Sequence, residues 1–221
     1  SDYVGSALYV SYLLDKNIDE NGYITTKGEY FVNGKNEVVN FWGINVSGQS
    51  FFGTSKEQIE LLTDTIAAMG YNMVRLIDWD AGFYSPNIFG NNGGTSVVDS
   101  SALDEFNYFW YCCKERGIYI DMVMLGGRYG STLKSIGSFT DEETSDISSG
   151  FKFETYIDSR LVNETKRLVK EVMTTTNKYT NTTLAEDKAL ALMEVANENN
   201  LTDMYGYYTS SEQYEFVSNS Y

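Results

Sequence analysis

The sequence predicts one α/β domain built on a parallel β-sheet, and three observations support this fold class. Four apolar segments of strand length alternate with segments of helical periodicity along the 221 residues. Each strand segment is apolar nearly throughout, as in a parallel sheet whose faces are covered by helices. The loops that follow the strands are long, whereas the loops after the first two helices are almost absent.

The N-terminal part predicts a lead-in and a β-hairpin. Residues 1–22 form the lead-in, and residues 23–221 form one domain. Residues 23–46, with the sequence YITTKGEYFVNGKNEVVNFWGINV, predict a hairpin whose turn is Asn33-Gly34. This hairpin continues into the first strand of the sheet, which we expect to end at Asn45.

The next two βα repeats have clear boundaries. In residues 54–70, Thr54 or Ser55 is a candidate N-cap and Gly70 a C-terminal stop. These residues predict a helix, whose apolar face is expected to contain Ile59, Leu62, Ile66 and Met69. A strand is predicted over residues 71–78. Residues 100–117 predict a second helix, with an inner face of Leu103, Phe106, Trp110 and Cys113.

The C-terminal half of the chain continues the alternation. Residues 118–125 predict a strand, and residues 126–150 a long loop. A helix is expected from residue 152 to about residue 177, and a fourth strand, ALALMEVAN, over residues 189–197. Residues 210–221 predict the beginning of another helix.

The difference in loop length favours a (β/α)8 TIM barrel, whose working face is built from the loops at the carboxyl ends of the strands. The chain would supply about the first four βα units plus the N-terminal β-hairpin. A doubly wound sheet is the alternative. Residues 43–53 after the first strand, GINVSGQSFFG, have neither the dinucleotide-binding nor the P-loop spacing of glycines.

Charge and composition exclude several function classes. The net charge of −15 repels phosphate backbones and anionic lipids, so neither nucleic acid nor a membrane is an expected partner. The chain has no histidine, which excludes Ser-His and Cys-His nucleophile systems and histidine-based zinc sites. Residues 17–28 have part of the spacing of a calcium loop, but Gly28 stands at the position of its bidentate Glu. We expect no metal and no cofactor.

The compartment is suggested by composition and not by cysteines. Cys112 and Cys113 are adjacent in a predicted helix, where their Cβ vectors diverge, so we expect two small apolar residues and no disulfide. The first ten residues lack the features of a signal peptide, so the chain is either cytosolic or has lost a signal. Abundant Asn, Ser, Thr and Tyr favour an extracellular protein.

Two charged residues in apolar strands are candidates for chemistry. Glu198 ends the fourth strand, where barrel enzymes place catalytic groups; the alternative is an exposed carboxylate that begins a loop. Arg75 interrupts an apolar strand, so it requires an anionic partner. Strand alternation puts Glu194, Ala196 and Glu198 on one face, and Arg75 could reach Glu194, Glu198 or a carboxylate on a later strand from the second strand. The alternative for Arg75 is a purely structural ion pair.

Loop aromatic residues suggest a carbohydrate ligand, because a flat ring can stack on the apolar face of a pyranose. Trp79 is the best candidate, although packing on the barrel rim is equally expected. For the other loop rings packing is favoured; these are Phe51, Phe52, Phe83, Tyr84 and Tyr129. Trp42 and Trp110 are expected to be structural.

Four segments together resemble the first half of a glycoside hydrolase family 5 domain, of clan A, and in particular its cellulase-like bacterial members. They are KGEYFVNGKNEVVNFWGINV, MGYNMVRLIDWD, LDEFNYFWYCCKERGIYIDMVML and DKALALMEVANENNL, between about residues 23 and 202. The resemblance implies that Glu198 is the general acid/base, that Asn197 binds a substrate hydroxyl and that Arg75 supports the nucleophile. Asp78, Asp80, Trp79 and Asn45 are further substrate-binding candidates.

The sequence also departs from the family pattern. Relatives often carry histidine just after the arginine of the second strand, where this chain has Ile77 and Asp78. The family nucleophile, a glutamate on the seventh strand, is expected beyond residue 221. A retaining glycosidase needs two carboxyl groups, so we expect the isolated chain to be inactive.

The resemblance therefore implies a secreted, bacterial glycoside hydrolase that cleaves a β-linked polysaccharide or oligosaccharide by a retaining mechanism. The alternative is a non-catalytic half-barrel that binds carbohydrate or packs against a partner. The expected partners are the sugar substrate and either the remaining half of the barrel or a second copy of the chain.

Overall fold

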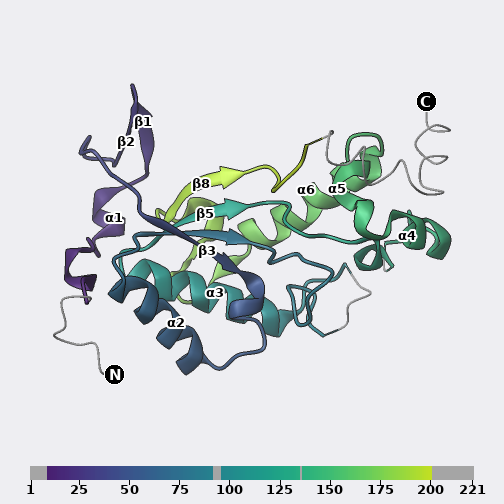
Figure 1. Cartoon of the computed structure of the whole chain (residues 1–221), viewed down its shortest axis with the longest axis horizontal. Coiled ribbons are helices and arrows are strands. Elements are labelled where there is room, and N and C mark those ends of the chain that lie inside the picture. The colour runs from purple at the N-terminus through teal and green to yellow at the C-terminus, as the bar shows by residue number, and fades with distance from the viewer. Residues whose placement is uncertain (1–8, 92–95, 135, 201–221) are drawn as a thin grey trace.

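The structure is a computed structural model that describes residues 9–91, 96–134 and 136–200. Four parallel strands form its central sheet in the order β3-β4-β5-β8. The strands are β3 (Gly43–Ser47), β4 (Met73–Ile77), β5 (Tyr119–Val123) and β8 (Leu190–Glu194). Each strand pairs with the strand of the next βα unit, and all four point the same way (Figure 1). The predicted fold class, a partial (β/α)8 barrel, is confirmed.

Three long helices connect the strands: α2 (Lys56–Ala68), α3 (Ser100–Glu115) and α6 (Ser159–Thr174). In Figure 1, α2 and α3 run side by side along one face of the sheet. Ser55 begins α2 with a capping box in which its hydroxyl accepts from the backbone of Gln58. The side chain of Asp99 caps α3 in the same position.

The main core lies between these helices and the sheet. The alternate strand residues that face the helices are fully or nearly fully buried: Val46, Val74, Leu76, Ile120 and Met122. From α3, Phe106 and Trp110 pack against them as predicted. The predicted face of α2 is wrong at its end, because Met69 is the exposed C-cap residue, while Thr63 and Ala67 are buried.

The N-terminal hairpin differs from the prediction. It pairs β1 (Thr25–Lys27) with β2 (Tyr30–Val32) through a turn at Gly28, whose φ of 63° favours glycine. The expected turn residue Asn33 begins a second turn, in which its side chain accepts from two backbone amides and brings Val38 to Val32. The first strand of the sheet also does not end at Asn45, since β3 continues to Ser47.

The tryptophans and cysteines give mixed outcomes. Trp110, Cys112 and Cys113 are buried, and both thiols are free, as expected. Trp42 is not part of the core: it precedes β3, is 67% exposed and stacks on Tyr71 with ring centroids 6.2 Å apart.

The segment between β5 and β8 contains more structure than predicted. The expected loop includes α4 (Asp141–Ile147), which begins with a capping box at Thr140. The expected single helix is two helices, α5 (Phe151–Glu154) and α6, separated because the side chain of Asp158 caps the start of α6. A small hairpin, β6 (Thr176–Asn177) with β7 (Thr182–Thr183), precedes β8.

The fold also contains several shorter helical elements. They are helix α1 (Ile18–Asn21) and 3-10 turns over Ser11–Leu13, Gly48–Ser50, Gly130–Leu133, Ser148–Gly150 and Leu184–Glu186. The helix expected over residues 210–221 lies outside the described residues. The extent of the domain over residues 23–221 stays a prediction.

A second apolar cluster lies under the segment after β5. Its buried members are Leu125, Leu133, Phe139, Ile147, Phe151 and Leu161. Next to it, the buried guanidinium of Arg128 pairs with Glu164 of α6 at 2.5 Å, and Glu164 also accepts from Arg167 at 2.6 Å. These contacts anchor the inserted segment to α6, so it is a folded part of the domain.

Glu154 of α5 is an unusual carboxyl group. It is 3% exposed, and its Oε2 has no hydrogen-bond partner among the described residues. Burial, with the negative charges of Asp158 and Asp146, raises the pKa of Glu154 to about 7. Ionisation of Glu154 therefore opposes packing of α5.

Stability should depend on pH through Glu154. Its folded-state pKa lies above the ordinary value of 4.5. The stability contributed by the protonated form of Glu154 is therefore complete below pH 4.5 and is lost as the pH rises through about 7. The loss amounts to at most about 3 kcal/mol. The free energy of unfolding of Glu154→Gln, relative to wild type, should therefore rise by up to this amount between pH 4.5 and 8. Urea titrations measure it, with Glu142→Gln on exposed α4 as the control; equal behaviour of the two variants would contradict the assignment.

Candidate active site

A layer of polar side chains crosses the face of the sheet opposite α2 and α3. Asn45 on β3, Arg75 on β4 and Asp121 on β5 are partners in register, so their side chains share one face and one level. Glu194 ends β8 and faces the same layer. Strands that are otherwise apolar thus bring four polar groups together.

Arg75 is the centre of this layer. Its Nε donates to Glu194 Oε1 at 2.5 Å, and its Nη2 donates to Glu194 Oε2 at 2.7 Å. This bidentate pair confirms the expectation that Arg75 reaches an acidic residue on the fourth strand. The pair holds the pKa of Glu194 below its usual range, and that of Arg75 above it.

Asp121 was missed by the sequence analysis. It is nearly buried between β4 and β8, and its Oδ1 has no hydrogen-bond partner within the described part of the chain. Burial first, and then neighbouring Glu194, raise the pKa of Asp121 to about 6, although Arg75 opposes this. A charged residue inside an apolar strand is the signal that singled out Arg75, and the sequence contains the same signal at Asp121.

Asn197 joins the layer from the turn after β8. Arg75 Nη2 donates to Asn197 Oδ1 at 3.1 Å, and the Asn197 amide donates to the carbonyl of Leu125 at 2.9 Å. The expected alternation that put Ala196 and Glu198 on the face of Glu194 is wrong, because β8 ends at Glu194. After Glu194, the next side chain of this segment that contacts Arg75 is that of Asn197.

Glu198 and Asp78 lie just past the ends of β8 and β4. Both have left-handed backbones, with φ of 48° for Glu198 and 53° for Asp78, which is uncommon for residues other than glycine. Burial raises the pKa of Asp78, Lys152 lowers it, Glu198 raises it and Arg75 lowers it. The charges of Lys152, Glu198 and Arg75 therefore all act on Asp78 at the carboxyl end of the sheet.

Trp79 is not available to stack on a sugar, contrary to one of the two sequence interpretations. The indole is 0% exposed and packs against Phe106, and its Nε1 donates to the carbonyl of Val123 at 2.6 Å. It therefore joins the end of β4 to β5 as a core residue.

Asp80 is also not positioned to bind a substrate hydroxyl. It is fully buried, and its carboxylate accepts from the amides of Gly126 and Gly127 at 3.1 Å. Burial raises its pKa to about 6 despite these bonds and nearby Arg128. A Cβ on Gly126 would lie 2.7 Å from the Asp78 amide nitrogen, so glycine is required where the two loops meet.

The remaining loop aromatics mainly pack, as expected. Phe51 and Phe52 are buried against α3. Phe83 contacts Tyr84 at a centroid distance of 4.4 Å and Tyr129 at 5.4 Å, but it remains 45% exposed. Phe83 thus presents an aromatic surface among the loops after β4 and β5.

An apolar groove of about 430 Å³ lies beside β8. The outer side of α6 contributes Val162 and Val169, and the turn after β8 contributes Val195 and Ala196. Val195 is exposed in this chain. The groove marks a side of the sheet that has no neighbouring βα unit in the described part of the chain.

The described residues contain neither a membrane-spanning helix nor a cluster of metal-ligating side chains. Among residues 9–91, 96–134 and 136–200, no helix is long and apolar enough to cross a bilayer. The same residues contain no cluster of three or more His, Cys, Asp or Glu side chains that could hold a metal ion.

Solved structures with the same fold were found by comparison of structures. An endo-1,4-β-mannanase from Rhizomucor miehei matches with a TM-score of 0.61 and 15% identity, over 80% of this chain and 48% of the other. A glycoside hydrolase family 5 mannosidase from Rhizomucor miehei gives 0.60 and 17%, over 82% and 50%. An endo-1,4-β-D-mannanase from Thermotoga petrophila gives 0.53 and 22%, over 82% and 52%.

The chain has the fold of half a family 5 barrel. It spans about half the length of the solved structures that it matches. No family model matches the sequence, and no curated protein matches it. The identities of 15–22% carry the fold only, so the roles of Glu198, Asn197, Arg75, Asp78 and Asn45 stay predictions.

The Arg75–Glu194 pair should contribute measurably to stability. It is bidentate, and 27% of the Arg75 side chain and 35% of the Glu194 side chain are exposed, so its strength should lie between that of a surface pair and that of a buried pair. A double-mutant cycle with Arg75→Met and Glu194→Gln should give a coupling energy of about 1–2 kcal/mol.

Urea unfolding of the four proteins in the cycle gives this coupling energy. The pair of Arg116 and Asp64, whose carboxylate side chain is 64% exposed, is a matched control and should give under about 1 kcal/mol. Additive effects of Arg75→Met and Glu194→Gln would show that the observed contact does not couple the two strands.

Proposed function

We propose that this chain is the N-terminal half of a retaining glycoside hydrolase barrel that cleaves β-linked polysaccharide. Glu198 is the general acid/base, Asn197 binds a substrate hydroxyl beside the cleaved bond, and Arg75 supports the nucleophile. Asp78 and Asn45 bind further hydroxyls at the mouth of the barrel.

The observation that carries this proposal is the convergence of polar groups at the carboxyl ends of parallel strands. Arg75 bonds Glu194 and Asn197 there, and Glu198 and Asp78 lie beside them with left-handed backbones. Barrel enzymes place their catalytic groups at this end. Uncommon backbone conformations of acidic residues are also concentrated at functional sites.

The proposed mechanism divides the chemistry between two carboxyl groups. Glu198 protonates the oxygen of the leaving sugar, and a second carboxylate about 5–5.5 Å away attacks the anomeric carbon. After the leaving sugar departs, Glu198 removes a proton from the water that hydrolyses the covalent intermediate. In this proposal the second carboxylate belongs to a strand of the other half of the barrel.

The substrate is a β-linked glycan, and β-mannan is the first one to test. The fold matches structures described as endo-1,4-β-mannanases. Phe83 offers an exposed ring among the mouth loops, and such a ring can stack on a pyranose. A polymeric substrate is consistent with a bacterial protein that acts outside the cell.

The alternative function is a non-catalytic half-barrel that packs against a partner. The apolar groove beside β8, which includes exposed Val195, favours this alternative. The two functions differ in whether the polar layer or the groove is the working surface.

Turnover and its dependence on the leaving group test the proposal. The chain alone should release no reducing sugar from β-mannan, because one carboxyl group cannot serve as both nucleophile and acid/base. Together with the other half of its barrel it should be active. Glu198→Gln should then reduce kcat by about 10²–10⁴-fold for natural glycosides, and much less for aryl glycosides with good leaving groups.

Glu186→Gln, on a surface turn before β8, is the matched control and should leave turnover unchanged. Equal loss for all leaving groups would contradict the acid role of Glu198. Robust turnover by the chain alone would contradict the proposed division of the two carboxyl groups. No turnover in any combination, with groove-dependent association, would favour the alternative.

A further inference from the structure

We propose that the segment Phe151–Tyr156, inserted after β5, clamps the turn that carries Glu198, with Lys152 and Tyr156 as its positioning residues. This inference rests on the proposed role of Glu198. It assigns a function to a part of the chain outside the strands and helices that form the barrel.

The clamp consists of two hydrogen bonds to backbone carbonyls on either side of Glu198. Lys152 Nζ donates to the carbonyl oxygen of Asn197 at 2.9 Å. Tyr156 Oη donates to the carbonyl oxygen of Asn199 at 2.9 Å. One segment therefore holds the peptide group directly before the proposed acid/base and the second peptide group after it.

The turn needs such support because it lies outside the sheet. The ladder of β8 ends at Glu194, and Glu198 has a φ of 48°. A left-handed backbone at a residue with a side chain is unfavourable in isolation. Contacts from outside the turn must keep it in place, and the Lys152 and Tyr156 bonds act at the residues next to this conformation.

The clamping segment is itself rigidly attached to the domain. Phe151 is fully buried in the second apolar cluster, and Glu154 is buried on the same short helix. The helical turns continue past α5. The backbone amide of Thr155 donates to the carbonyl oxygen of Phe151, and the backbone amide of Tyr156 donates to that of Phe153. Buried residues thus alternate with Lys152 and Tyr156, which face the turn after β8.

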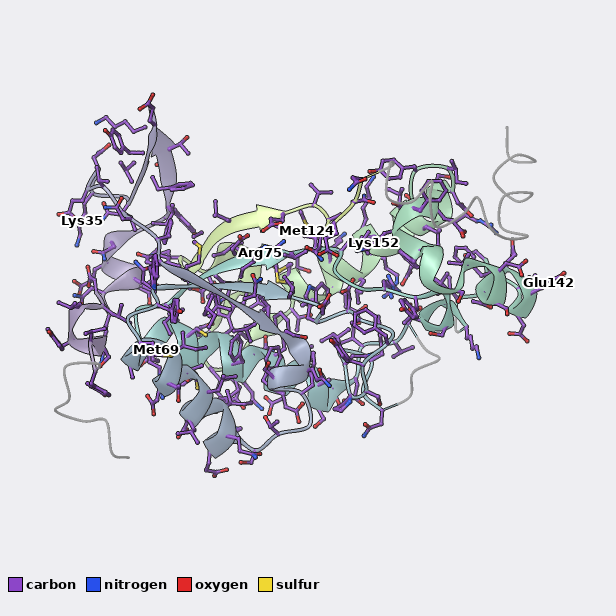
Figure 2. The ribbon with its side chains drawn as sticks, viewed as in Figure 1. Lys35, Met69, Arg75, Met124, Glu142 and Lys152 are labelled. Atoms are coloured by element: carbon purple, nitrogen blue, oxygen red, sulfur yellow. The ribbon has the colours of Figure 1, made fainter. Side chains whose placement is uncertain are left out.

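Charge also favours the position of Lys152. Its ammonium group lowers the pKa of Asp78, whereas Glu198 and burial raise it. A cation at this point offsets the repulsion between the carboxylates at the mouth. Figure 2 shows Lys152 beyond the carboxyl ends of the strands, on the side of Arg75 toward α5.

Amide hydrogen exchange of the full chain tests the clamp without requiring turnover. The double variant Lys152→Met/Tyr156→Phe should increase exchange at the Asn197 backbone amide, which donates to the Leu125 carbonyl, by about tenfold or more, since a charge-assisted and a neutral hydrogen bond that hold the turn are both lost. Exchange in β4 and β5 should be unchanged. Lys27→Met/Tyr30→Phe, on the exposed β1–β2 hairpin, makes the same chemical changes away from the turn and is the control.

Two further readouts separate positioning from a general structural role. Lys152→Met should raise the pKa of Asp78, measured by carboxyl ¹³C NMR, whereas Lys152→Arg should restore both this pKa and the protection of the Asn197 backbone amide. In an active barrel, the double variant should lower kcat with little change in KM, and Lys152→Arg should restore part of kcat.

The outcomes distinguish the two proposals. Unchanged exchange at the Asn197 backbone amide in the double variant would overturn the clamp, whatever the activity. Increased exchange with no change in kcat of an active barrel would overturn its positioning role. Increased exchange in a protein without turnover in any combination would leave the clamp in place as structure and contradict the proposed function on which its positioning role rests.

Discussion

The bidentate pair between Arg75 and Glu194 is the constraint on which the mouth of the sheet depends. It joins β4 to β8 across β5, at the level where Asp121 is nearly buried. Both side chains are partly exposed, so an unpaired charge here would cost less than one in a fully buried site, and the pair links the polar groups on this face. Arg75 also donates a hydrogen bond to the side chain of Asn197, and this bond fixes the start of the turn that carries Glu198.

The sequence predicted the framework well because its signals are local and repeated. Apolar runs, N-caps and terminal glycines determined the four strands and the helices α2 and α3, and their order then required a parallel sheet. The expectation that Arg75 contacts an acidic residue, with Glu194 among the candidates, followed from the need of an arginine inside an apolar strand for an anion. The same need applies to any charged residue inside an apolar strand, so Asp121 was predictable in principle.

The loops could not be predicted to the same extent, because their conformations depend on contacts between distant segments. Trp79 and Asp80 look like mouth residues in the sequence, but Val123, Gly126 and Gly127 of the next βα unit bury them. The break between α5 and α6 depends on a single cap at Asp158. Without that break, Lys152 and Tyr156 would lie on a continuous helix, so no sequence pattern indicated their bonds to the turn after β8.

We infer that the polar layer at the carboxyl ends of β4, β5 and β8 binds carbohydrate. The most direct measurement is an NMR titration of the chain with a β-1,4-linked manno-oligosaccharide, which reports binding even in the absence of turnover. We expect saturable shift changes at the Arg75 Nε–H group and at the backbone amides of Asn197 and Glu198. Arg75→Met should abolish these changes. Saturable changes confined to the groove around Val162 and Val195, or no saturable change with this and other β-linked oligosaccharides, would contradict this inference.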